Sequence, residues 1–381
     1  MNEQVYCDYA ATAPLRPEVQ AALAEAGRLE GNPSSIHWAG QTAKVHLERA
    51  RSSVAAALGV EPREIIFTSG GTEANNTVFA GLLQPGDHVV TSAIEHPCVQ
   101  RPLERLAKWG VTFSTVAPDA TGAVQAGDLE QALRPETRLI SLMAVNNETG
   151  VINDLAAAGE MAAQHNILFH TDAVQALGKI PLNAAQLGLH FLAASAHKIG
   201  GPKGMGLLLA RSGTPFMPLL AGGSQENSHR GGTENLAGII GFAKALELAL
   251  AEQEELHKRQ AAIRKTFLAT LDRNRVHYRL NGAGAYPGII NIQLPGIGGQ
   301  AMVMNMDAEG FAISYGSSCA SGTAEPSHVL LAMGLTEQAA AESIRFSFGY
   351  GSSEAQAEGA AAAVSRVVAR MGQPAAEPAV S

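Results

Sequence analysis

A lysine and an aspartate stand at the ends of apolar segments, where charged groups are uncommon. Lys198 follows the mostly apolar run HFLAASA (190–196), and Asp172 lies at the end of NILFHTDA (166–173). A carboxylate there is costly without a cationic partner, and a lysine there either extends its amine to solvent or takes part in chemistry. Gln175 lies three residues beyond Asp172. These side chains are the first candidates for a reactive site.

A glycine pair follows another apolar segment and suits an anion. EIIFT (64–68) continues into SGGTEANN (69–76), in which Gly71 and Thr72 open a predicted helix. Glycines let backbone N–H groups crowd a phosphate, the helix dipole favours negative charge, and a hydroxyl adds a donor. The alternative is an ordinary glycine turn with Thr72 as the helix N-cap.

Single polar residues follow two further strand candidates. His96 comes just after HVVTSA (88–93), and Asn146 and Asn147 follow RLISLMAV (138–145). Taken one at a time, the histidine is typical of a helix cap or a packed residue, and the asparagines are typical of a turn. Their common position at strand ends gives them a second interpretation as members of one site.

Five strand ends with separate polar groups together predict a pyridoxal 5'-phosphate site. That cofactor requires a lysine for a Schiff base, an acid for its ring nitrogen, a phosphate cradle and a flat ring beside it. A nucleotide would use the cradle but not this pairing of lysine and aspartate. GAGAYPG (282–288) looks like a dinucleotide loop, but its glycine spacing is wrong and no helix is predicted after it.

Cys319 lies in YGSSCASGTAEP (315–326), among small residues that offer it nothing to pack against. A loop of small residues reorders at low cost, so we expect a thiol that moves; the alternative is a cysteine without a role, which would invite oxidation. Cys7, in the apolar run VYC, is expected to be packed. Cys98 lies near a predicted helix start, which can lower the pKa of a thiol, but we do not expect it to be the reactive cysteine.

The order of the elements predicts an α/β fold. The five strand candidates above and GMGLLLA (204–210) alternate with helical patterns, which favours a mainly parallel sheet covered by helices on both faces. Ligands then bind beyond the carboxyl ends of the strands. One unbroken helical pattern from Phe242 to Phe267 is expected to bridge two domains. GIINIQL (288–294) and SIRFSFG (343–349) predict strands of a smaller α+β domain, which the N-terminal segment joins.

Composition narrows the class of protein. The 381 residues are 46% apolar and 16% charged, with a net charge of −8, which argues against nucleic acid or an anionic membrane as the main partner. No apolar run reaches the roughly 18 residues of a membrane span, and the start of the chain does not fit a signal peptide. Three scattered cysteines indicate neither a disulfide framework nor a zinc site, so we expect a cytoplasmic protein without a metal.

Taken together, the motifs resemble those of the NifS/IscS-like cysteine desulfurases, pyridoxal phosphate enzymes of the class-V aminotransferase superfamily. The resemblance runs from about Val5 to about Met371 and rests on DYAATAP (8–14), GNPSS-H (31–37), TSGGTEANN (68–76), EHP (95–97), VNNETGV (145–151), TDAVQALGK (171–179), SAHKIGGPKGMG (195–206), RGGTEN (230–235) and SSCASGTAEPSHVL (317–330). It implies the type I fold of pyridoxal phosphate-dependent transferases, with a large domain holding a mainly parallel seven-stranded sheet. The implied boundaries are 15–255 for the large cofactor-binding domain, 1–14 with 256–371 for the small domain that carries the cysteine loop, and 372–381 for a disordered tail.

The resemblance also implies a role for each matching residue. Lys198 matches the lysine that holds the cofactor, Asp172 the acid that keeps the ring nitrogen protonated, and Cys319 the nucleophile. His96 matches the ring stacked on the cofactor and is the nearest proton acceptor for a thiol. The other matches are Gln175 and Asn147 near the phenolic oxygen, Gly71, Thr72, Ser195 and His197 at the phosphate, Thr233 reaching the phosphate from a second subunit, and Arg345 with Asn147 at the substrate carboxylate.

The implied activity converts L-cysteine to L-alanine and leaves a persulfide on Cys319. The sulfur then passes to an acceptor protein of iron–sulfur cluster assembly or tRNA thiolation, and the enzyme is expected to be a homodimer. The alternatives are a selenocysteine lyase or another pyridoxal phosphate-dependent lyase, and, outside enzymes, a sulfur-transfer scaffold. The chain departs from the pattern at Asn227 and Ser228, where relatives usually have Arg-Gly, and at Tyr350, where they usually have arginine.

Overall fold

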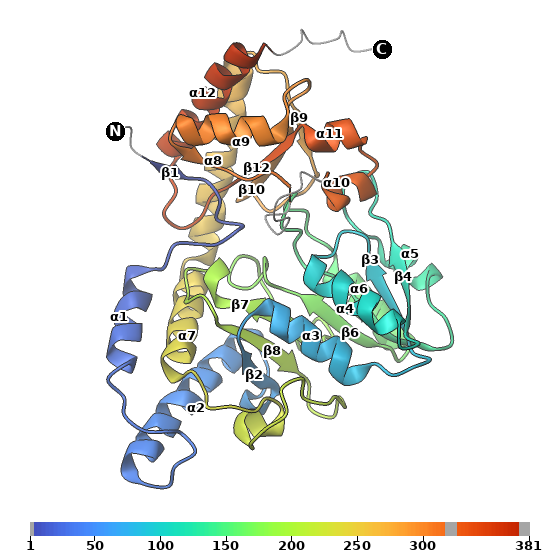
Figure 1. The fold of residues 1–381 in the computed structure, drawn as a ribbon, viewed down its shortest axis with the longest axis vertical. Helices are drawn as coiled ribbons and strands as arrows, with labels where there is room; N and C mark the ends of the chain where they lie inside the picture. Colours follow the sequence, from blue (N-terminus) through green and yellow to red (C-terminus); the bar gives the residue numbers. More distant parts are fainter. Residues whose placement is uncertain (1–3, 317–325, 373–381) are drawn as a thin grey trace.

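The computed structural model describes residues 4–316 and 326–372. Cys319 and all of the predicted disordered tail except Gly372 lie outside these residues. Figure 1 shows a larger unit built on one sheet and a smaller unit stacked on one end of it. None of the helices in the described ranges is long and apolar enough to cross a membrane.

The larger unit is built on a seven-stranded sheet with the order β2-β8-β7-β6-β5-β3-β4. Only β8 runs antiparallel to its neighbours, so the mainly parallel sheet is confirmed. The strand that the sequence did not predict is β4, an edge strand whose residues are mostly exposed or half-buried and therefore form no apolar run. The strands are β2 (Ile65–Thr68), β3 (His88–Ser92), β4 (Thr112–Val116), β5 (Thr137–Ser141), β6 (Leu168–Asp172), β7 (Phe191–Ser195) and β8 (Gly206–Ala210).

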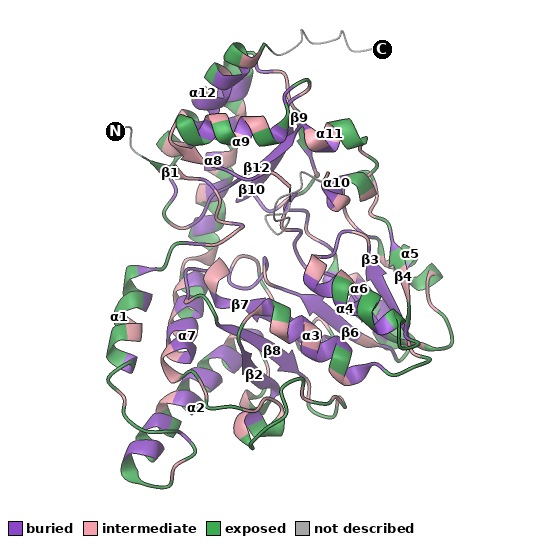
Figure 2. Ribbon diagram, in the orientation of Figure 1, coloured by how far each residue is buried: buried purple, intermediate pink, exposed green. Residues whose placement is uncertain are grey.

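Helices cover both faces of this sheet because successive strand residues point to opposite sides. Ile66 and Phe191 belong to a core with α3 (Gly71–Leu82) and α4 (Pro97–Ala107). Their neighbours Phe67 and Leu192 pack into the opposite core. The helices of that second layer are α2 (Trp38–Leu58), α6 (Leu155–Gln164) and α7 (Leu236–Ala251), with α1 (Pro17–Ala26) against α7 and the short α5 (Ala126–Gln131) beside α6. Figure 2 shows the buried strands between helices with exposed outer faces.

The smaller unit has a separate apolar core around an antiparallel sheet of order β12-β10-β9. The N-terminal segment joins it, because β1 (Val5–Tyr6) pairs with β11 (Phe311–Ala312) and Cys7 is fully buried in its core, as predicted for this thiol. The other elements are β9 (Arg279–Asn281), β10 (Ile289–Gln293), β12 (Ser343–Ser347), α8 (Gln253–Arg273), α9 (Gly299–Ala308), α10 (His328–Ala332), α11 (Glu337–Ala341) and α12 (Glu354–Met371).

The single helix expected from Phe242 to Phe267 is two helices, so that expectation was wrong. α7 ends at Ala251 and α8 begins at Gln253, with Glu252 between them. α7 packs on α1 and α2 of the larger unit, whereas α8 packs on α12 of the smaller unit. Arg16 Nη1 donates to both carboxylate oxygens of Glu252 at 2.9 Å, so a side-chain contact from outside the helix marks the break, which neither glycine nor proline signals.

Candidate active site between the two units

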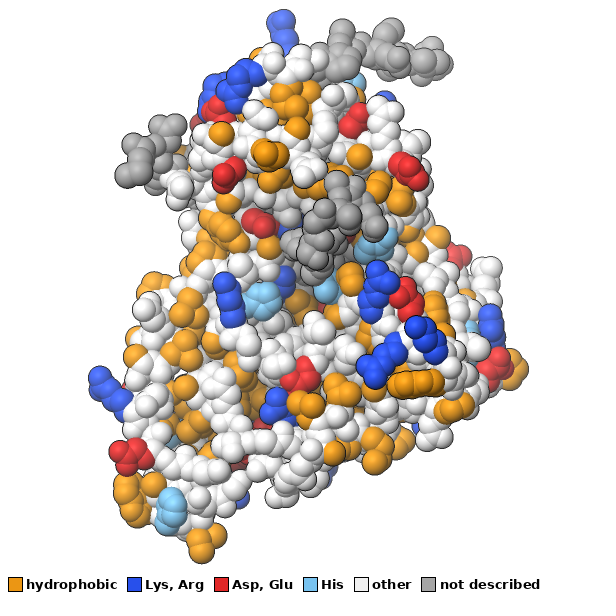
Figure 3. Space-filling view, viewed as in Figure 1, with side chains coloured by type: hydrophobic (Ala, Val, Ile, Leu, Met, Phe, Trp, Pro, Cys, Tyr) orange, Lys and Arg blue, Asp and Glu red, His pale blue; other side chains and the backbone are white. Residues whose placement is uncertain are grey.

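A cavity of about 250 Å³ lies where the carboxyl ends of the parallel strands meet the smaller unit. Figure 3 shows histidine and basic side chains on the surface of the narrow region between the units. Eleven residues singled out in the sequence line this cavity: Gly71, Thr72, His96, Cys98, Asn147, Asp172, Gln175, Ser195, His197, Lys198 and Arg345. The fold therefore gathers residues that are up to 274 positions apart in the chain (345 − 71).

Lys198 lies at the end of a short 3₁₀ turn (Ala196–Lys198) that follows β7 directly. Its amine donates to the carbonyl oxygens of Ala10 and Ala11 at 2.6 and 2.8 Å. The segment between β1 and α1 thus forms one wall of the cavity and holds the amine at the sheet edge. A lysine that extended into solvent would make no such pair of backbone contacts.

Asp172 is nearly fully buried at the end of β6. One carboxylate oxygen accepts from Asn75 Nδ2 at 2.8 Å and the other from the Val174 N–H at 2.9 Å. Asp172 lines the cavity and interacts electrostatically with His96. A protonated ring nitrogen fits beside it, because a buried carboxylate is stabilised by a cationic partner.

Asn75 is a site residue that the sequence reasoning missed, although it lies in the quoted motif 68–76. It is fully buried on α3, four residues after Gly71, and turns toward the sheet. The four-residue spacing places it one helical turn from the cavity-lining end of α3. That spacing was the available signal.

The amino end of α3 forms the part of the cavity that suits a phosphate group. Gly70 is the N-cap, so Thr72 lies within the helix, and the alternative in which Thr72 caps it was wrong. The backbone is crowded here: a Cβ on Gly206 would lie 2.5 Å from the Cα of Gly70. Free N–H groups of the helix, together with the lining residues Thr72, Ser195 and His197, suit a phosphate.

His197 and His96 are both held toward the neutral form. Burial first, and then the nearby Lys198 cation, lower the pKa of His197 to about 4. Burial also lowers the pKa of His96, reinforced by Lys198 and His328 and opposed by Asp172. The Nδ1 of His96 accepts from the backbone N–H of Cys98 at 3.1 Å, so its Nε2 carries the proton.

Cys98 lines the cavity but is not an activated thiol. Its sulfur lies 2.9 Å from His96 Nδ1 and 3.0 Å from Asn75 Nδ2. Burial and the neighbouring Asp172 raise its pKa. The lowering that a helix start can cause does not occur here, because burial and a carboxylate outweigh the helix terminus.

The adjacent asparagines have different surroundings. Asn146 forms the expected turn: its Oδ1 accepts from the backbone N–H groups of Glu148 and Thr149, both at 2.9 Å. Asn147 lines the cavity, and its backbone carbonyl oxygen accepts from Arg345 Nη1 at 2.8 Å. Only the second asparagine is therefore available to a ligand.

Arg345 enters the cavity from β12 of the smaller unit. It is 2% exposed and donates from Nη2 to Asp8 Oδ1 at 2.7 Å. Its Nε has no partner among the described residues. A buried guanidinium with an unused donor at a cavity suits a carboxylate ligand.

Two predicted site residues are not placed in this cavity. Thr233 is exposed and does not line it. Cys319 lies outside the described residues. Two side chains close to the end of that gap contact the larger unit: Ser327 Oγ donates to Glu148 Oε2 at 2.5 Å, and His328 Nε2 lies 2.9 Å from the carbonyl oxygen of Glu95.

The departures from the family pattern lie outside the cavity. Asn227 and Ser228 are exposed. Tyr350, where an arginine was expected, lies under the guanidinium of Arg16, 4.2 Å from the ring centroid, and its hydroxyl donates to Pro14 O at 2.9 Å. A cation is therefore present beside position 350, although it comes from another segment.

Comparisons with known proteins agree with this geometry. The family model described as aminotransferase class-V matches residues 5–359. The chain is 44% identical to a cysteine desulfurase IscS of Dictyoglomus turgidum, over 92% of this chain and 90% of the relative. It is 40% identical to a cysteine desulfurase IscS of Methanosarcina thermophila, over 91% and 88%.

Solved structures give the same relationship. A NifS-like protein superimposes with a TM-score of 0.90 at 31% identity, over 96% of this chain and all of that one. A NifS-like protein from Rickettsia africae superimposes with a TM-score of 0.86 at 30% identity, with the same coverage. The chain therefore belongs to the class-V aminotransferase family, whose members depend on pyridoxal 5'-phosphate.

Proposed function

We propose that this protein is a cysteine desulfurase, which converts L-cysteine to L-alanine and transfers the sulfur to Cys319. The observation that carries the proposal is the presence of the Lys198 amine, the buried Asp172 carboxylate and the amino end of α3 around one cavity. The names of the similar proteins, cysteine desulfurase IscS and NifS-like protein, support the choice of substrate.

The lining residues suit pyridoxal phosphate group by group. Gly71, Thr72, Ser195 and His197 would hold its phosphate, and Asp172 its ring nitrogen. His96 would lie on the ring, Gln175 would donate to the phenolic oxygen, and Lys198 would hold the aldehyde carbon. When bound, the cofactor stores the electrons released at the substrate Cα.

The protein's own groups would bind the substrate and move its protons. Arg345 would donate to the carboxylate of cysteine, with Asn147 beside it. Lys198 would take the Cα proton. Neutral His96 would accept the proton of one of the two thiols at Nδ1, in place of its hydrogen bond from the Cys98 N–H. The C–S bond of the substrate breaks and an S–S bond forms between that sulfur and Cys319. The electron pair of the C–S bond stays with the carbon, and one proton, equivalent to the one that the Cys319 thiol loses, replaces sulfur on the carbon that becomes the methyl group of alanine.

The sulfur acceptor and the assembly are part of the same proposal. Cys319 persulfide would deliver sulfur to a protein of iron–sulfur cluster assembly or tRNA thiolation. Thr233, exposed in the single chain, would complete the phosphate site of a second copy in a homodimer. We place the enzyme in the cytoplasm, which keeps the free thiols Cys7 and Cys98 reduced.

Borohydride reduction followed by peptide mapping tests the attachment site. The purified yellow protein should acquire a pyridoxyl group on Lys198, whereas a Lys198→Ala variant should acquire none. An unmodified Lys198 in the reduced wild-type protein would refute the proposal.

Assays with Cys319→Ser and Cys98→Ser test the sulfur step. Cys319→Ser should keep its colour and respond to cysteine without releasing sulfide, while Cys98→Ser should retain most of the activity. Sulfide release by Cys319→Ser at the wild-type rate would exclude Cys319 as the acceptor. If the wild-type protein turned over selenocysteine but not cysteine, a selenocysteine lyase would be favoured instead.

A further inference from the structure

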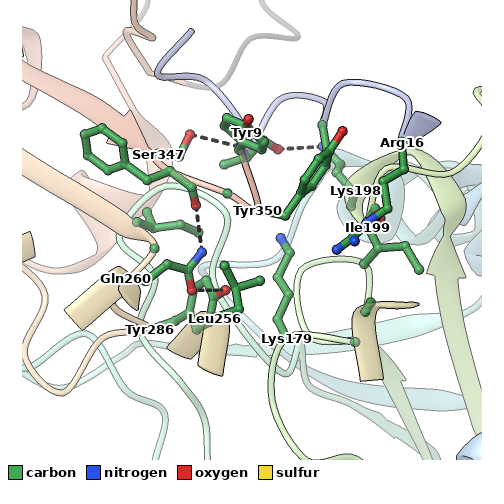
Figure 4. A pocket seen from close by; sticks show the side chains of 18 residues that line it. Tyr9, Arg16, Lys179, Lys198, Ile199, Leu256, Gln260, Tyr286, Ser347 and Tyr350 are labelled. Atoms are coloured by element: carbon green, nitrogen blue, oxygen red, sulfur yellow. Dashed lines mark hydrogen bonds between the residues drawn. The ribbon is translucent and has the colours of Figure 1, made fainter. Parts of the chain in front are cut away.

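Lys179 is a second lysine close to the candidate site. Figure 4 shows it in a neighbouring pocket that Lys198 also lines. Its Nζ donates to Gln175 Oε1 at 2.6 Å and lies 5.9 Å from the ring centroid of Tyr286. It forms no ion pair with a carboxylate of the described residues. Even a half-buried cation is costly without a counter-charge, so its presence here calls for a role.

The contacts of Gln175 determine which way its amide points. An ammonium group only donates, so the amide atom that faces Lys179 must be the oxygen. A carbonyl oxygen only accepts, so the Gln175 atom 2.8 Å from Ala10 O must be the amide nitrogen Nε2. Both contacts require the same orientation of the Gln175 side chain. Its amide nitrogen, Nε2, is therefore beside Lys198, whose Nζ also donates to Ala10 O.

Gln175 retains a donor in this orientation. An amide nitrogen carries two hydrogens, and Ala10 O takes one of them. Gln175 lines the cavity, so the second N–H is available to a ligand there. An inverted amide would present its oxygen to the cavity instead and would repel an anionic oxygen.

We infer that Lys179 is a positioning residue, which holds the Gln175 amide with its donor toward the ligand. The inference rests on the proposed function, in which the phenolic oxygen of pyridoxal phosphate accepts that hydrogen bond. Lys179 acts through Gln175 and does not line the larger cavity itself.

The surroundings of Lys179 keep its amine in place. Tyr286 is 2% exposed, and its hydroxyl donates to Gln260 Oε1 at 2.5 Å. Gln260 Nε2 in turn donates to Phe348 O at 2.7 Å, so the smaller unit holds the ring that faces the lysine. The remaining space is a cavity of about 30 Å³, lined also by Arg16, Tyr9 and Tyr350, with room for one or two waters.

The charge of Lys179 is sensitive to this environment. Burial first, and then the Lys198 and Arg345 cations, lower its pKa to about 7. A neutral amine has a lone pair and no longer distinguishes the two ends of an amide as an ammonium does. An arginine, which stays charged and only donates, is therefore the conservative replacement.

The test uses full-length protein titrated with pyridoxal phosphate, in wild type, Lys179→Met, Lys179→Arg and the control Lys203→Met. Lys203 is an exposed lysine near the same site, so its loss removes a charge without touching Gln175. Lys179→Met should bind pyridoxal phosphate about 10-fold more weakly, the effect of one hydrogen bond. The pH midpoint of the visible absorbance should rise by about 0.5–1 unit, since an anionic oxygen loses a donor. Lys179→Arg should recover most of both changes.

A double-mutant cycle with Gln175→Ala separates positioning from simple charge. If Lys179 acts through Gln175, Lys179→Met should change neither quantity further in the Gln175→Ala background. Equal shifts in both backgrounds, or an unchanged midpoint in Lys179→Met, would overturn the inference. Thermal unfolding of each variant shows whether it folds, and Lys179→Gln is the second variant if methionine is not tolerated. Failure of wild-type protein to bind pyridoxal phosphate would instead refute the proposed function.

Discussion

Arg51 and Arg345 are both almost completely buried, and they differ in how many donors they use inside the protein. Arg51 lies on α2 in the larger unit, where Nη1 and Nη2 bind the two oxygens of Glu226 at 2.6 and 2.9 Å. Nη1 also donates to Ile65 O, and Nε contacts the Glu48 carboxylate. Glu226 accepts a further hydrogen bond from the Phe67 N–H, so both members of this pair are satisfied.

Arg345 is bound less completely. It uses one oxygen of Asp8 and one backbone carbonyl, and its Nε is unused among the described residues. The side chain of Asp8 is 17% exposed, compared with 2% for that of Glu226. The difference separates a structural guanidinium, whose three nitrogens all donate inside the protein, from one that lines the cavity with an unbonded Nε.

Replacement of Arg51 should have the largest effect of the changes considered, and the effect should be on folding. Arg51→Met leaves Glu226 buried without its partner, so we expect a loss of about 3–5 kcal/mol in the free energy of unfolding. Urea unfolding monitored by circular dichroism measures it. The double variant Arg51→Met/Glu226→Met should recover much of the loss. A normal unfolding free energy in the single variant would show that the pair is not structural.

Replacement of Arg345 should affect catalysis instead. Arg345→Lys loses the fork of parallel donors, so kcat/KM for cysteine should fall about 100-fold, which corresponds to about 2.7 kcal/mol. Arg51→Lys is the control, with unchanged kcat/KM in the fraction that remains folded. If the two variants reduced kcat/KM equally, the distinction between the arginines would be lost.

His170 extends the comparison to a buried group that pH can charge. Burial lowers its pKa from 6.5 to about 3, and its Nδ1 lies 2.8 Å from Ser141 Oγ. As the pH falls, His170 therefore takes up its proton in the unfolded chain before it does so in the folded protein. The contribution of neutral His170 to stability is complete above pH 6.5 and is lost as the pH falls toward 3. Between pH 7 and pH 5 the loss should be about 2 kcal/mol.

Unfolding free energies of His170→Gln at these two pH values check the prediction. The variant should lose less stability on acidification than wild type. His165→Gln, at an exposed histidine beside Glu130, is the control and should behave as wild type. Identical pH dependence in wild type and His170→Gln would contradict the assignment.

The smallest effect is expected beside the Arg51–Glu226 pair, where the backbone is strained. Glu226, Asn227 and Ser228 have φ values of 49°, 54° and 66°, in the left-handed region. Ser228→Gly removes a penalty of about 1–2 kcal/mol and adds chain entropy to the unfolded state, so a net gain of about 0.5–1 kcal/mol is expected. Ser224→Gly, at φ −79°, should not stabilise the protein. A destabilised Ser228→Gly variant would show that the serine side chain is needed.

The sheet and most of the cavity lining could be predicted because each depends on local patterns. Six of the strands in the large sheet appear as apolar runs, and the groups at their ends must converge when the strands are parallel. β4 was missed because an edge strand needs no apolar run. The break at Glu252 was missed because a side-chain contact with Arg16 marks it, and no glycine or proline does.

Residues that act through other residues carry little signal of their own. Asn75 and Lys179 stand within quoted motifs, but their partners Asp172 and Gln175 are known only from the folded chain. Cys98 shows the converse: its position at a helix start favours a low pKa, and burial beside Asp172 reverses the direction.

The sequence by itself determined the types of groups at the strand ends, and so the kind of ligand that could bind there. Only the tertiary structure decided how completely each group is bound inside the protein, as the unbonded Nε of Arg345 and the fully used nitrogens of Arg51 show. The physical reason is that residue type sets what a side chain can bond to. Burial and the neighbours brought from distant parts of the chain set how much of that capacity is already used.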